Sequence, residues 1–503
     1  MVARAACHTG ARSPLSGIGQ SDLLDSPRAG SRALRGGSVR TGGYVLTILL
    51  SLVAVPLLIR HLGVVGYGRY VVVISVVAVV SGLTEGGLNA IALREYATTS
   101  GVERKHMMHD ALGVRLVLTT VGALAAVAFA ALAGYGTALV LGTALAGIGM
   151  LLQLVQGLLA VSLESELRYG WVTACDLLRQ TVSVALLVGL ILAGAGIVAL
   201  LGVAIPASGA SLLLTAWLVR GRISLRPAFA LRKWWPLIRD SVPWAAVLAV
   251  NVVYFRLVII LMSVVATAVQ TGYFATSLRI VEVLIGIPAL AVGAAYPILA
   301  RAAHADGERF SYTSGRLFEL SLVAGTWMVV CLEIGAPFAI HVLAGNQSDP
   351  SIAVLRIQGL AVIATFLAVG CGIPLLTLRR YREALVANLA ALALSAGLTV
   401  ALVGPLGARG GAIAAVGAEF TLAALVVRFL VRAIPNVHLA WITVPTVALA
   451  GVAATGLGLL LPVHPVIAAT VASGVYFLLL RLLGRLPPEI RELLSHPGRS
   501  RPA

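Results

Sequence analysis

The chain has 503 residues, of which 59% are hydrophobic and only 11% are charged, and its formal net charge is +17. A soluble domain cannot hold so much apolar surface, because a large share of its residues must face water. The basic residues lie in short loops between apolar runs, where they indicate membrane orientation rather than a nucleic-acid interface. The composition therefore predicts a membrane protein that does not bind nucleic acid.

Residues 1–40 differ from the rest of the chain. They are rich in Arg, Ser and Gly and contain no apolar run long enough for a secretory signal. We interpret them as a disordered cytoplasmic N-terminal tail, or as an over-long reading frame whose true start lies near Val39 rather than at Met1. In both cases the fold is expected to begin at residue 41.

Apolar stretches of membrane-spanning length recur from residue 41 onward. Each can cross a hydrocarbon core of roughly 30 Å as a helix, which satisfies its own backbone hydrogen bonds in lipid. The predicted fold class is an all-α polytopic membrane protein with about fourteen transmembrane helices. The expected spans are 42–60, 66–84, 111–133, 137–160, 174–193, 196–219, 242–263, 274–299, 317–340, 352–377, 384–403, 410–431, 440–461 and 464–483.

Basic residues are distributed unevenly between the two ends of these spans. With a cytoplasmic N-terminus, the segments expected outside hold few of them, chiefly Arg60, Arg69, Arg356 and Arg409. The inside segments hold most of the rest, as the positive-inside pattern requires. We therefore predict a multi-pass protein of the inner (plasma) membrane with both termini in the cytoplasm.

The longest inside loop divides the chain near its middle, and a Gly-Tyr dipeptide occurs at a corresponding place on each side of it. Gly66-Tyr67 opens the second expected span, and Gly272-Tyr273 opens the eighth. Paired helix groups of this kind are a common transporter plan. The predicted parts are a six-helix group at 41–219, a basic cytoplasmic linker at 220–241, a second six-helix group at 242–432, two extra transmembrane helices at 433–485 and a cytoplasmic tail at 486–503.

Short motifs stand out from the apolar background in both halves. In the first half they are PLLIRHLG from Pro56, GYGRY from Gly66, LTEGGL from Leu83 and REYA from Arg94. In the second half they are VYFRLVIIL from Val253, GYFA from Gly272, LRIVE from Leu278, and Pro288 to Tyr296-Pro297. Together they resemble the polysaccharide or oligosaccharide flippases of the multidrug/oligosaccharidyl-lipid/polysaccharide exporter superfamily.

Two positions depart from the pattern of that family. Val258 and Ile259 follow Arg256 where the family often has an Asp, and Glu85 stands where it often has Asp. The resemblance implies two six-helix bundles around a central cavity that opens alternately to each side, with two further helices at the end. It also implies the function: flipping an undecaprenyl-diphosphate-linked oligosaccharide from the cytoplasmic to the outer leaflet, together with glycan assembly enzymes.

Arginines within the expected spans are the candidate substrate-binding residues. A guanidinium suits a lipid diphosphate, because its planar fork donates paired hydrogen bonds to phosphate oxygens. Arg256 lies about fourteen residues into its span, either in the cavity or reaching to the outer interface. Arg279 is a second phosphate ligand, or one member of a self-satisfying pair with Glu282 three residues later. Arg60 and Arg69 flank the first outer turn as substrate ligands or as interfacial anchors.

Acidic side chains within the spans are candidates for binding the H⁺ or Na⁺ that drives transport, because a membrane carboxylate needs a partner. These are Glu282, Glu333 and Glu419, of which the last two have no partner nearby in the sequence. The four cysteines show no metal-binding spacing, and no phosphate-binding glycine loop precedes a helix. The sequence therefore predicts no metal and no cofactor.

Three other functions compete with glycan transport, one of which is a membrane scaffold that transports nothing. A drug/cation antiporter of the same superfamily would favour acidic and aromatic residues in its cavity over arginines. A membrane glycan polymerase or ligase would need a sizeable outer loop, whereas the longest one here, near Gly345–Pro350, is short. The sequence thus favours a transporter that is not an enzyme.

Overall fold

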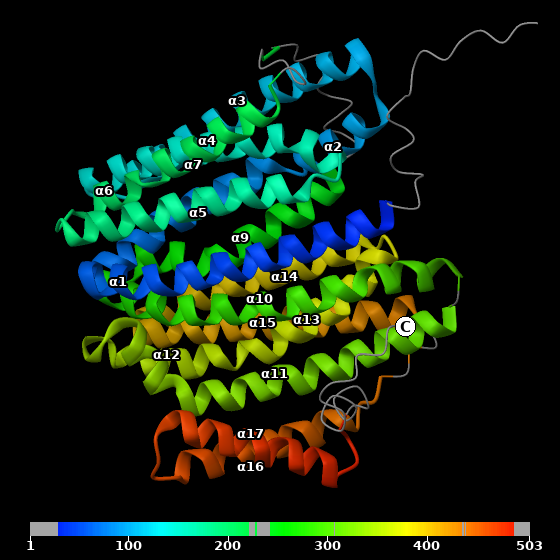
Figure 1. The fold of residues 1–503 in the computed structure, drawn as a ribbon. Coiled ribbons are helices and arrows are strands. Elements are labelled where there is room, and N and C mark those ends of the chain that lie inside the picture. Colours follow the sequence, from blue (N-terminus) through cyan, green and yellow to red (C-terminus); the bar gives the residue numbers. More distant parts are fainter. Residues whose placement is uncertain are drawn as a thin grey trace, which may run out of the picture.

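The computed structural model describes residues 29–220, 227–228, 242–305, 307–434, 437 and 439–486. In this part of the chain all regular structure is helical, as predicted, and Figure 1 shows the long helices running side by side. The helices are α1 (Ala29–Glu85), α2 (Leu88–Thr98), α3 (Gly101–Leu132), α4 (Thr137–Ser165), α5 (Tyr169–Leu192), α6 (Ile197–Gly202), α7 (Ala204–Leu218), α9 (Val242–Val265), α10 (Ala268–Ala305), α11 (Gly307–Ala344), η2 (Asn346–Ser348), α12 (Pro350–Gly359), α13 (Ala361–Thr377), α14 (Tyr381–Leu406), α15 (Ala408–Ala433), α16 (Thr443–Leu460) and α17 (Pro465–Leu482).

The long helix α1 consists of two arms that meet at Gly63. This residue has φ 67° and ψ 176°, a backbone conformation that side chains with a Cβ atom avoid. The first residues of α1 and the helix α2 lie at the same end of the molecule, so the chain reverses its direction at Gly63 (Figure 1). The expected spans 42–60 and 66–84 are these two arms, and the helix begins at Ala29 rather than at residue 41.

Eleven helical stretches among the described residues are long and apolar enough to cross a membrane. This agrees with a polytopic membrane protein. Each expected span overlaps a helix, but α6 and α7 share 196–219, α12 and α13 share 352–377, and α9 contributes only the shorter apolar stretch Ala249–Val265. The number of fourteen crossings stays a prediction.

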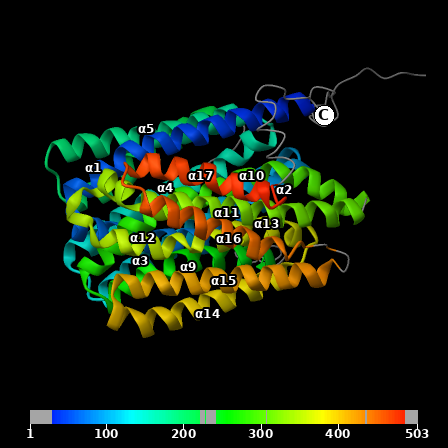
Figure 2. The same cartoon turned by 90° about the horizontal axis from the view of Figure 1, so that it is seen from below.

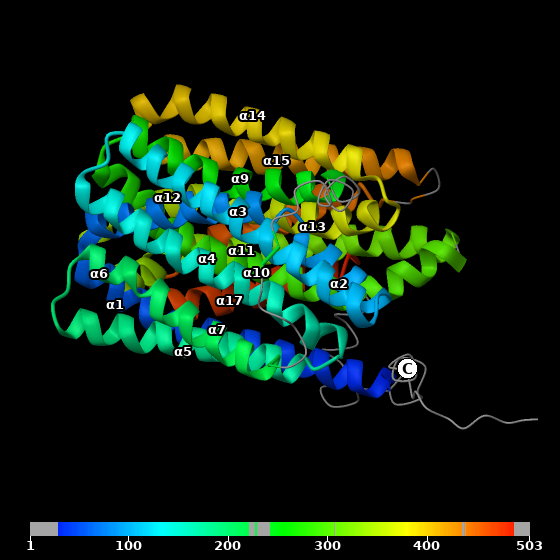
Figure 3. The same cartoon turned by 90° about the horizontal axis from the view of Figure 1, so that it is seen from above.

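The helices group in space according to their order in the chain. In Figure 1, α3 to α7 lie at the top, α10 to α15 lie below them, and α16 and α17 lie at the bottom. Figure 2, from below, shows α16 and α17 on the near side, and Figure 3, from above, shows α3, α4 and α7. The helix α1 contacts both α9 and α10 and so links the first half of the chain to the second, whereas α16 and α17 pack on α11.

Parts of the predicted domain plan fall outside the described residues. These are residues 1–28 of the tail, most of the linker 220–241 and residues 487–503. The two-bundle plan and its boundaries stay predictions.

The connections expected outside the cell gather at one end, called here the predicted outer end. There the two halves are in contact. Arg60 Nη2 in α1 donates to the backbone oxygen of Val342 in α11 at 2.8 Å. An added Cβ atom on Gly68 would lie 2.7 Å from Cα of Gly272, which shows how closely α1 and α10 approach. These contacts join the two halves at the predicted outer end.

Candidate functional site: a charged cavity between the two halves

A cavity of about 210 Å³ lies where α1 and α5 of the first half face α9 and α10 of the second. Aliphatic side chains form much of its wall. The polar and aromatic residues that line it are Ser51, Tyr67, Tyr70, Gln180, Ser183, Arg256, Arg279 and Glu282. Because both halves contribute to this wall, the cavity changes shape whenever the halves move relative to each other.

Neighbouring helices place the three charged groups together. Arg256 lies on α9, and Arg279 and Glu282 lie one turn apart on α10, so their side chains leave the same face of that helix. On the opposite face of α10, Phe274 and Val281 are buried against other helices. The apolar packing of α10 therefore turns its charged face toward the cavity.

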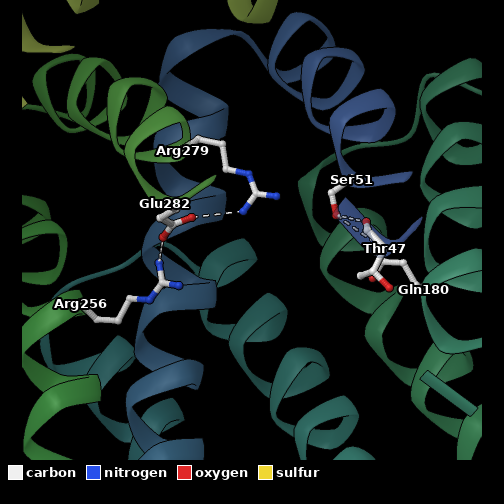
Figure 4. A network of polar contacts seen from close by, with 6 residues as sticks. All are labelled: Thr47, Ser51, Gln180, Arg256, Arg279 and Glu282. Atoms are coloured by element: carbon white, nitrogen blue, oxygen red, sulfur yellow. Dashed lines mark hydrogen bonds and ion pairs between the residues drawn. The ribbon is translucent and has the colours of Figure 1, made fainter. Parts of the chain in front are cut away.

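Glu282 is shared by both arginines. Arg256 Nη1 donates to Glu282 Oε1 at 2.5 Å, and Arg279 Nη1 donates to Glu282 Oε2 at 3.2 Å (Figure 4). The three side chains are 25%, 31% and 24% exposed, in the order Arg256, Arg279 and Glu282. Two guanidinium groups and one carboxylate leave net positive charge, with several N–H donors to spare. The site can therefore accept an anion.

The wall opposite the charged group carries neutral donors and acceptors. Gln180 Nε2 of α5 donates to Ser51 Oγ of α1 at 3.2 Å, and Ser51 Oγ donates to the backbone oxygen of Thr47 at 2.9 Å. Figure 4 shows this chain of contacts across from the two arginines. Hydroxyl and amide groups of this kind can hydrogen-bond sugar hydroxyls or phosphate oxygens.

Five of the predicted site residues lie in three locations. Arg256, Arg279 and Glu282 meet in the central cavity, and the expected pair of Arg279 with Glu282 is present but also includes Arg256. Arg60 contacts the end of α11, and Arg69 lines a second cavity at the predicted outer end. The roles assigned to these residues stay predictions.

The two other predicted acids receive partners from distant parts of the chain. Glu333 Oε2 on α11 lies 3.9 Å from Arg356 Nε on α12. Glu419 on α15 is 6% exposed and accepts a hydrogen bond of 2.9 Å from Thr365 Oγ1 on α13. The Tyr254 hydroxyl on α9 also hydrogen-bonds Glu419. In the described part of the chain, Glu419 is thus held by hydroxyl groups, whereas Glu333 and Glu282 face arginines.

A further buried cation, Arg115 on α3, was not among the candidates. Its side chain is 0% exposed, and Nη2 donates to Asn89 Oδ1 at 2.5 Å. Asn89 Nδ2 in turn donates to Glu85 Oε1 at 3.2 Å. The signal that could have identified Arg115 was an arginine inside the expected span 111–133.

No metal centre occurs among the described residues. No group of three His, Cys, Asp or Glu side chains there could hold an ion. Cys175, Cys331 and Cys371 are free thiols, and Cys7 lies outside the described residues.

The fold is that of the MOP superfamily of membrane transporters. A solved structure of the lipid II flippase MurJ in an inward closed conformation matches it with a TM-score of 0.72 at 11% identity, covering 89% of this chain and 98% of that one. An inward-facing multidrug resistance MATE transporter of the superfamily matches with a TM-score of 0.60 at 14% identity, covering 78% and 94%. A MOP superfamily transporter from Pyrococcus furiosus matches with a TM-score of 0.54 at 15% identity, covering 81% and 95%.

The sequence of the chain identifies its family. The profile of the family described as polysaccharide biosynthesis protein matches residues 33–303, which is more than half of the chain. The protein belongs to this polysaccharide biosynthesis family. No curated protein sequence matches it significantly. Family and fold together confirm the resemblance found in the motifs.

Proposed function

We propose that this protein flips an undecaprenyl-diphosphate-linked oligosaccharide from the cytoplasmic to the outer leaflet of the plasma membrane, by alternating access. The observation that supports this most is the presence of Arg256 and Arg279 in one cavity between the two halves. Charge buried in a membrane is costly, so two arginines with a single carboxylate need a reason. A diphosphate substrate supplies that reason, because its oxygens accept charge-assisted hydrogen bonds from both groups.

Glu282 would act as a placeholder for the substrate. It accepts hydrogen bonds from both arginines and holds them in position. An arriving diphosphate carries more negative charge than one carboxylate and takes over these donors. The arginines exchange their hydrogen bonds to Glu282 for hydrogen bonds to the diphosphate, so the net gain on binding is small. The substrate is therefore not held too tightly and can leave on the other side.

The small size of the central cavity means that transport of an oligosaccharide requires the two halves to move apart, as alternating access supposes. About 210 Å³ is smaller than the roughly 300–1,000 Å³ of ordinary small-molecule sites, so an oligosaccharide needs a wider opening. Contacts at Arg60, Gly68 and Gly272 join the two halves at the predicted outer end. Separation of the halves at the opposite end would admit the substrate from the cytoplasm.

The charges in the central cavity and the short outer connections argue against a drug/cation antiporter and against a glycan polymerase or ligase. Glu282 is the only acid among the described residues that line the cavity, and two arginines already occupy it, which disfavours a cationic drug as substrate. A glycan polymerase or ligase would need an outer platform, but only the three residues of η2 and short connections separate α11 from α12. A lipid-linked anion suits the charges of the central cavity better than a cationic drug does.

Glu419 is our candidate for coupling transport to H⁺ or Na⁺. It is buried between α9, α13 and α15, and its described partners are the hydroxyl groups of Thr365 and Tyr254. A membrane carboxyl group without a cationic side chain becomes neutral only by taking up a proton or a metal cation. Glu282 and Glu333 are the weaker candidates, because each already has an arginine partner.

Transport in reconstituted liposomes tests the proposal. Liposomes with the purified protein should move an undecaprenyl-diphosphate-linked oligosaccharide between leaflets, measured by access of an added glycosidase to the sugar. The double variant Arg256→Ala/Arg279→Ala should lose this activity, and Arg409→Ala, an exposed arginine outside the cavity, should keep it. Equal movement in protein-free liposomes, or full activity of the double variant, would reject the proposal.

A further inference from the structure

The two walls of the central cavity differ in charge. Of the described residues that line it, those with charged side chains, Arg256, Arg279 and Glu282, all belong to α9 and α10 of the second half. The residues that α1 and α5 of the first half contribute are neutral, and the polar ones include Gln180 and Ser183. The cavity therefore suits a ligand that is anionic on one side and neutral but polar on the other.

The polar side chains of α5 have hydrogen-bonding capacity to spare. Gln180 and Ser183 lie one turn apart, so their side chains leave the same face of the helix. Nε2 of Gln180 donates to Ser51 Oγ at 3.2 Å. In the part of the chain that the structure describes, the Gln180 amide makes no other hydrogen bond and the Ser183 hydroxyl makes none. One amide N–H, the amide oxygen and a hydroxyl group are thus available to a ligand.

The chemistry of this neutral wall matches a sugar. The side-chain amide of Gln180 offers a donor and an acceptor next to each other, which suits two neighbouring hydroxyl groups of a sugar ring. Tyr67 and Tyr70, one turn apart on α1, line the same cavity, and a tyrosine ring can pack against the C–H face of a sugar. Without a cation, this wall has no preference for phosphate.

We propose that Gln180 and Ser183 bind the sugar residue that is attached directly to the diphosphate, and that they distinguish the loaded lipid from the bare carrier. This inference rests on the proposed function, because a diphosphate on Arg256 and Arg279 brings its first sugar to the wall across the cavity (Figure 4). The loaded lipid contacts both halves, whereas undecaprenyl diphosphate contacts only the second.

Selectivity follows from the groups that the bare carrier leaves unpaired. A site with donors and acceptors for a sugar disfavours a ligand that lacks the sugar, since polar groups taken out of water then have no partner. The first half therefore determines which lipid is transported, and the second half supplies affinity for the diphosphate that all these lipids share.

The binding of four lipids to the purified full-length protein in neutral detergent micelles tests this assignment. They are undecaprenyl diphosphate and its derivatives with a single glucose, galactose or N-acetylglucosamine. The wild type should bind at least one derivative about tenfold more tightly than the bare lipid, as expected for two neutral hydrogen bonds. Gln180→Leu, which keeps a side chain of similar size, should lose most of this preference without a change in affinity for the bare lipid.

Two further variants sharpen the measurement. Ser183→Ala should lose a smaller part of the preference, and the double variant Gln180→Leu/Ser183→Ala should bind all four lipids alike. Gln153→Leu is the matched control, because Gln153 is an exposed glutamine of α4 in the same half and does not line the cavity. It should keep the preference of the wild type.

The bare lipid separates this inference from the proposed function. Equal weakening of bare and loaded lipids by Gln180→Leu would indicate a structural role through Ser51 and overturn the assignment. Equal affinity of the wild type for all four lipids, or an unchanged preference in the double variant, would overturn it as well. In each of these cases, binding of the bare lipid that depends on Arg256 leaves the proposed function standing. Failure of all four lipids to bind would reject both proposals.

Discussion

The two halves of the molecule each hold arginine inside an apolar helix, but in opposite surroundings. Arg115 of the first half is 0% exposed, and its Nη2 donates to Asn89. Arg256 of the second half has a side chain that is 25% exposed and lines a cavity that both halves enclose. The first arginine is enclosed by protein, whereas the second is open to a ligand.

This difference separates an arginine enclosed by protein from one that lines a cavity, where we propose that it binds the substrate. Arg115 links α3 to Asn89 on α2 and, through Asn89, to Glu85 at the end of α1. It therefore fixes the positions of three helices relative to one another. Arg256 and Arg279 share one acid and keep donors free toward the cavity. Burial, rather than the mere presence of arginine in a span, distinguishes the surroundings of Arg115 and Arg256.

The largest effect on stability is expected at Arg115. Replacement by Ala leaves a cavity and leaves Asn89 Oδ1 without its donor, and we expect a loss of about 3 kcal/mol, as for a large-to-small change with one unsatisfied buried acceptor. Thermal unfolding of the purified protein in detergent measures this loss. Arg115→Met, which keeps most of the volume, separates the packing contribution from that of the charge.

The comparison with the cavity arginine provides the control for this prediction. Arg256→Ala should unfold at nearly the wild-type temperature, because Glu282 keeps Arg279 as its partner. If Arg115→Ala and Arg256→Ala lowered the unfolding temperature equally, burial would not distinguish the two arginines, and our interpretation of the comparison would be wrong.

A smaller effect on stability is expected at Glu419. Glu419→Gln keeps an oxygen that can accept from Thr365, so the free energy of unfolding should change by less than about 1 kcal/mol. Transport should nevertheless stop responding to an imposed proton or sodium gradient, because the amide cannot bind either ion as a carboxylate does. The measurement is transport in liposomes with and without each gradient.

Glu333→Gln is the matched control for Glu419→Gln. Glu333 is also an acid within an apolar helix, but it lies 3.9 Å from Arg356. Its replacement should leave the response to the gradient in place. A gradient response that survives in Glu419→Gln and disappears in Glu333→Gln would transfer the coupling role to Glu333.

Local patterns in the sequence predicted much of this structure. Apolar stretches located the helices, since each stretch folds by its own backbone hydrogen bonds in lipid. The contact between Arg279 and Glu282 could be predicted because three residues bring two side chains to one helix face. The Gly-Tyr landmarks lie on α1 and α10, and Gly68, two residues after the first landmark glycine, packs against Gly272 of the second.

Contacts between helices could not be predicted in the same way. Arg256 and Glu282 are 26 residues apart, and Thr365 and Glu419 are 54 apart, so only the packing of α9, α10, α13 and α15 brings them together. For the same reason Arg115 could not be assigned to Asn89 across the turn between α2 and α3. Side-chain chemistry identified candidates, but tertiary packing decides their partners.

The binding of undecaprenyl diphosphate to the purified protein tests the central claim most directly, because it asks whether the cavity arginines recognise a lipid diphosphate. We predict that Arg256→Ala binds it about tenfold or more weakly than the wild type, which corresponds to one lost charge-assisted hydrogen bond. Arg256→Lys should lie between the two, since it keeps the charge and loses the planar fork. Equal affinity of all three proteins would contradict the account and remove Arg256 from the substrate site.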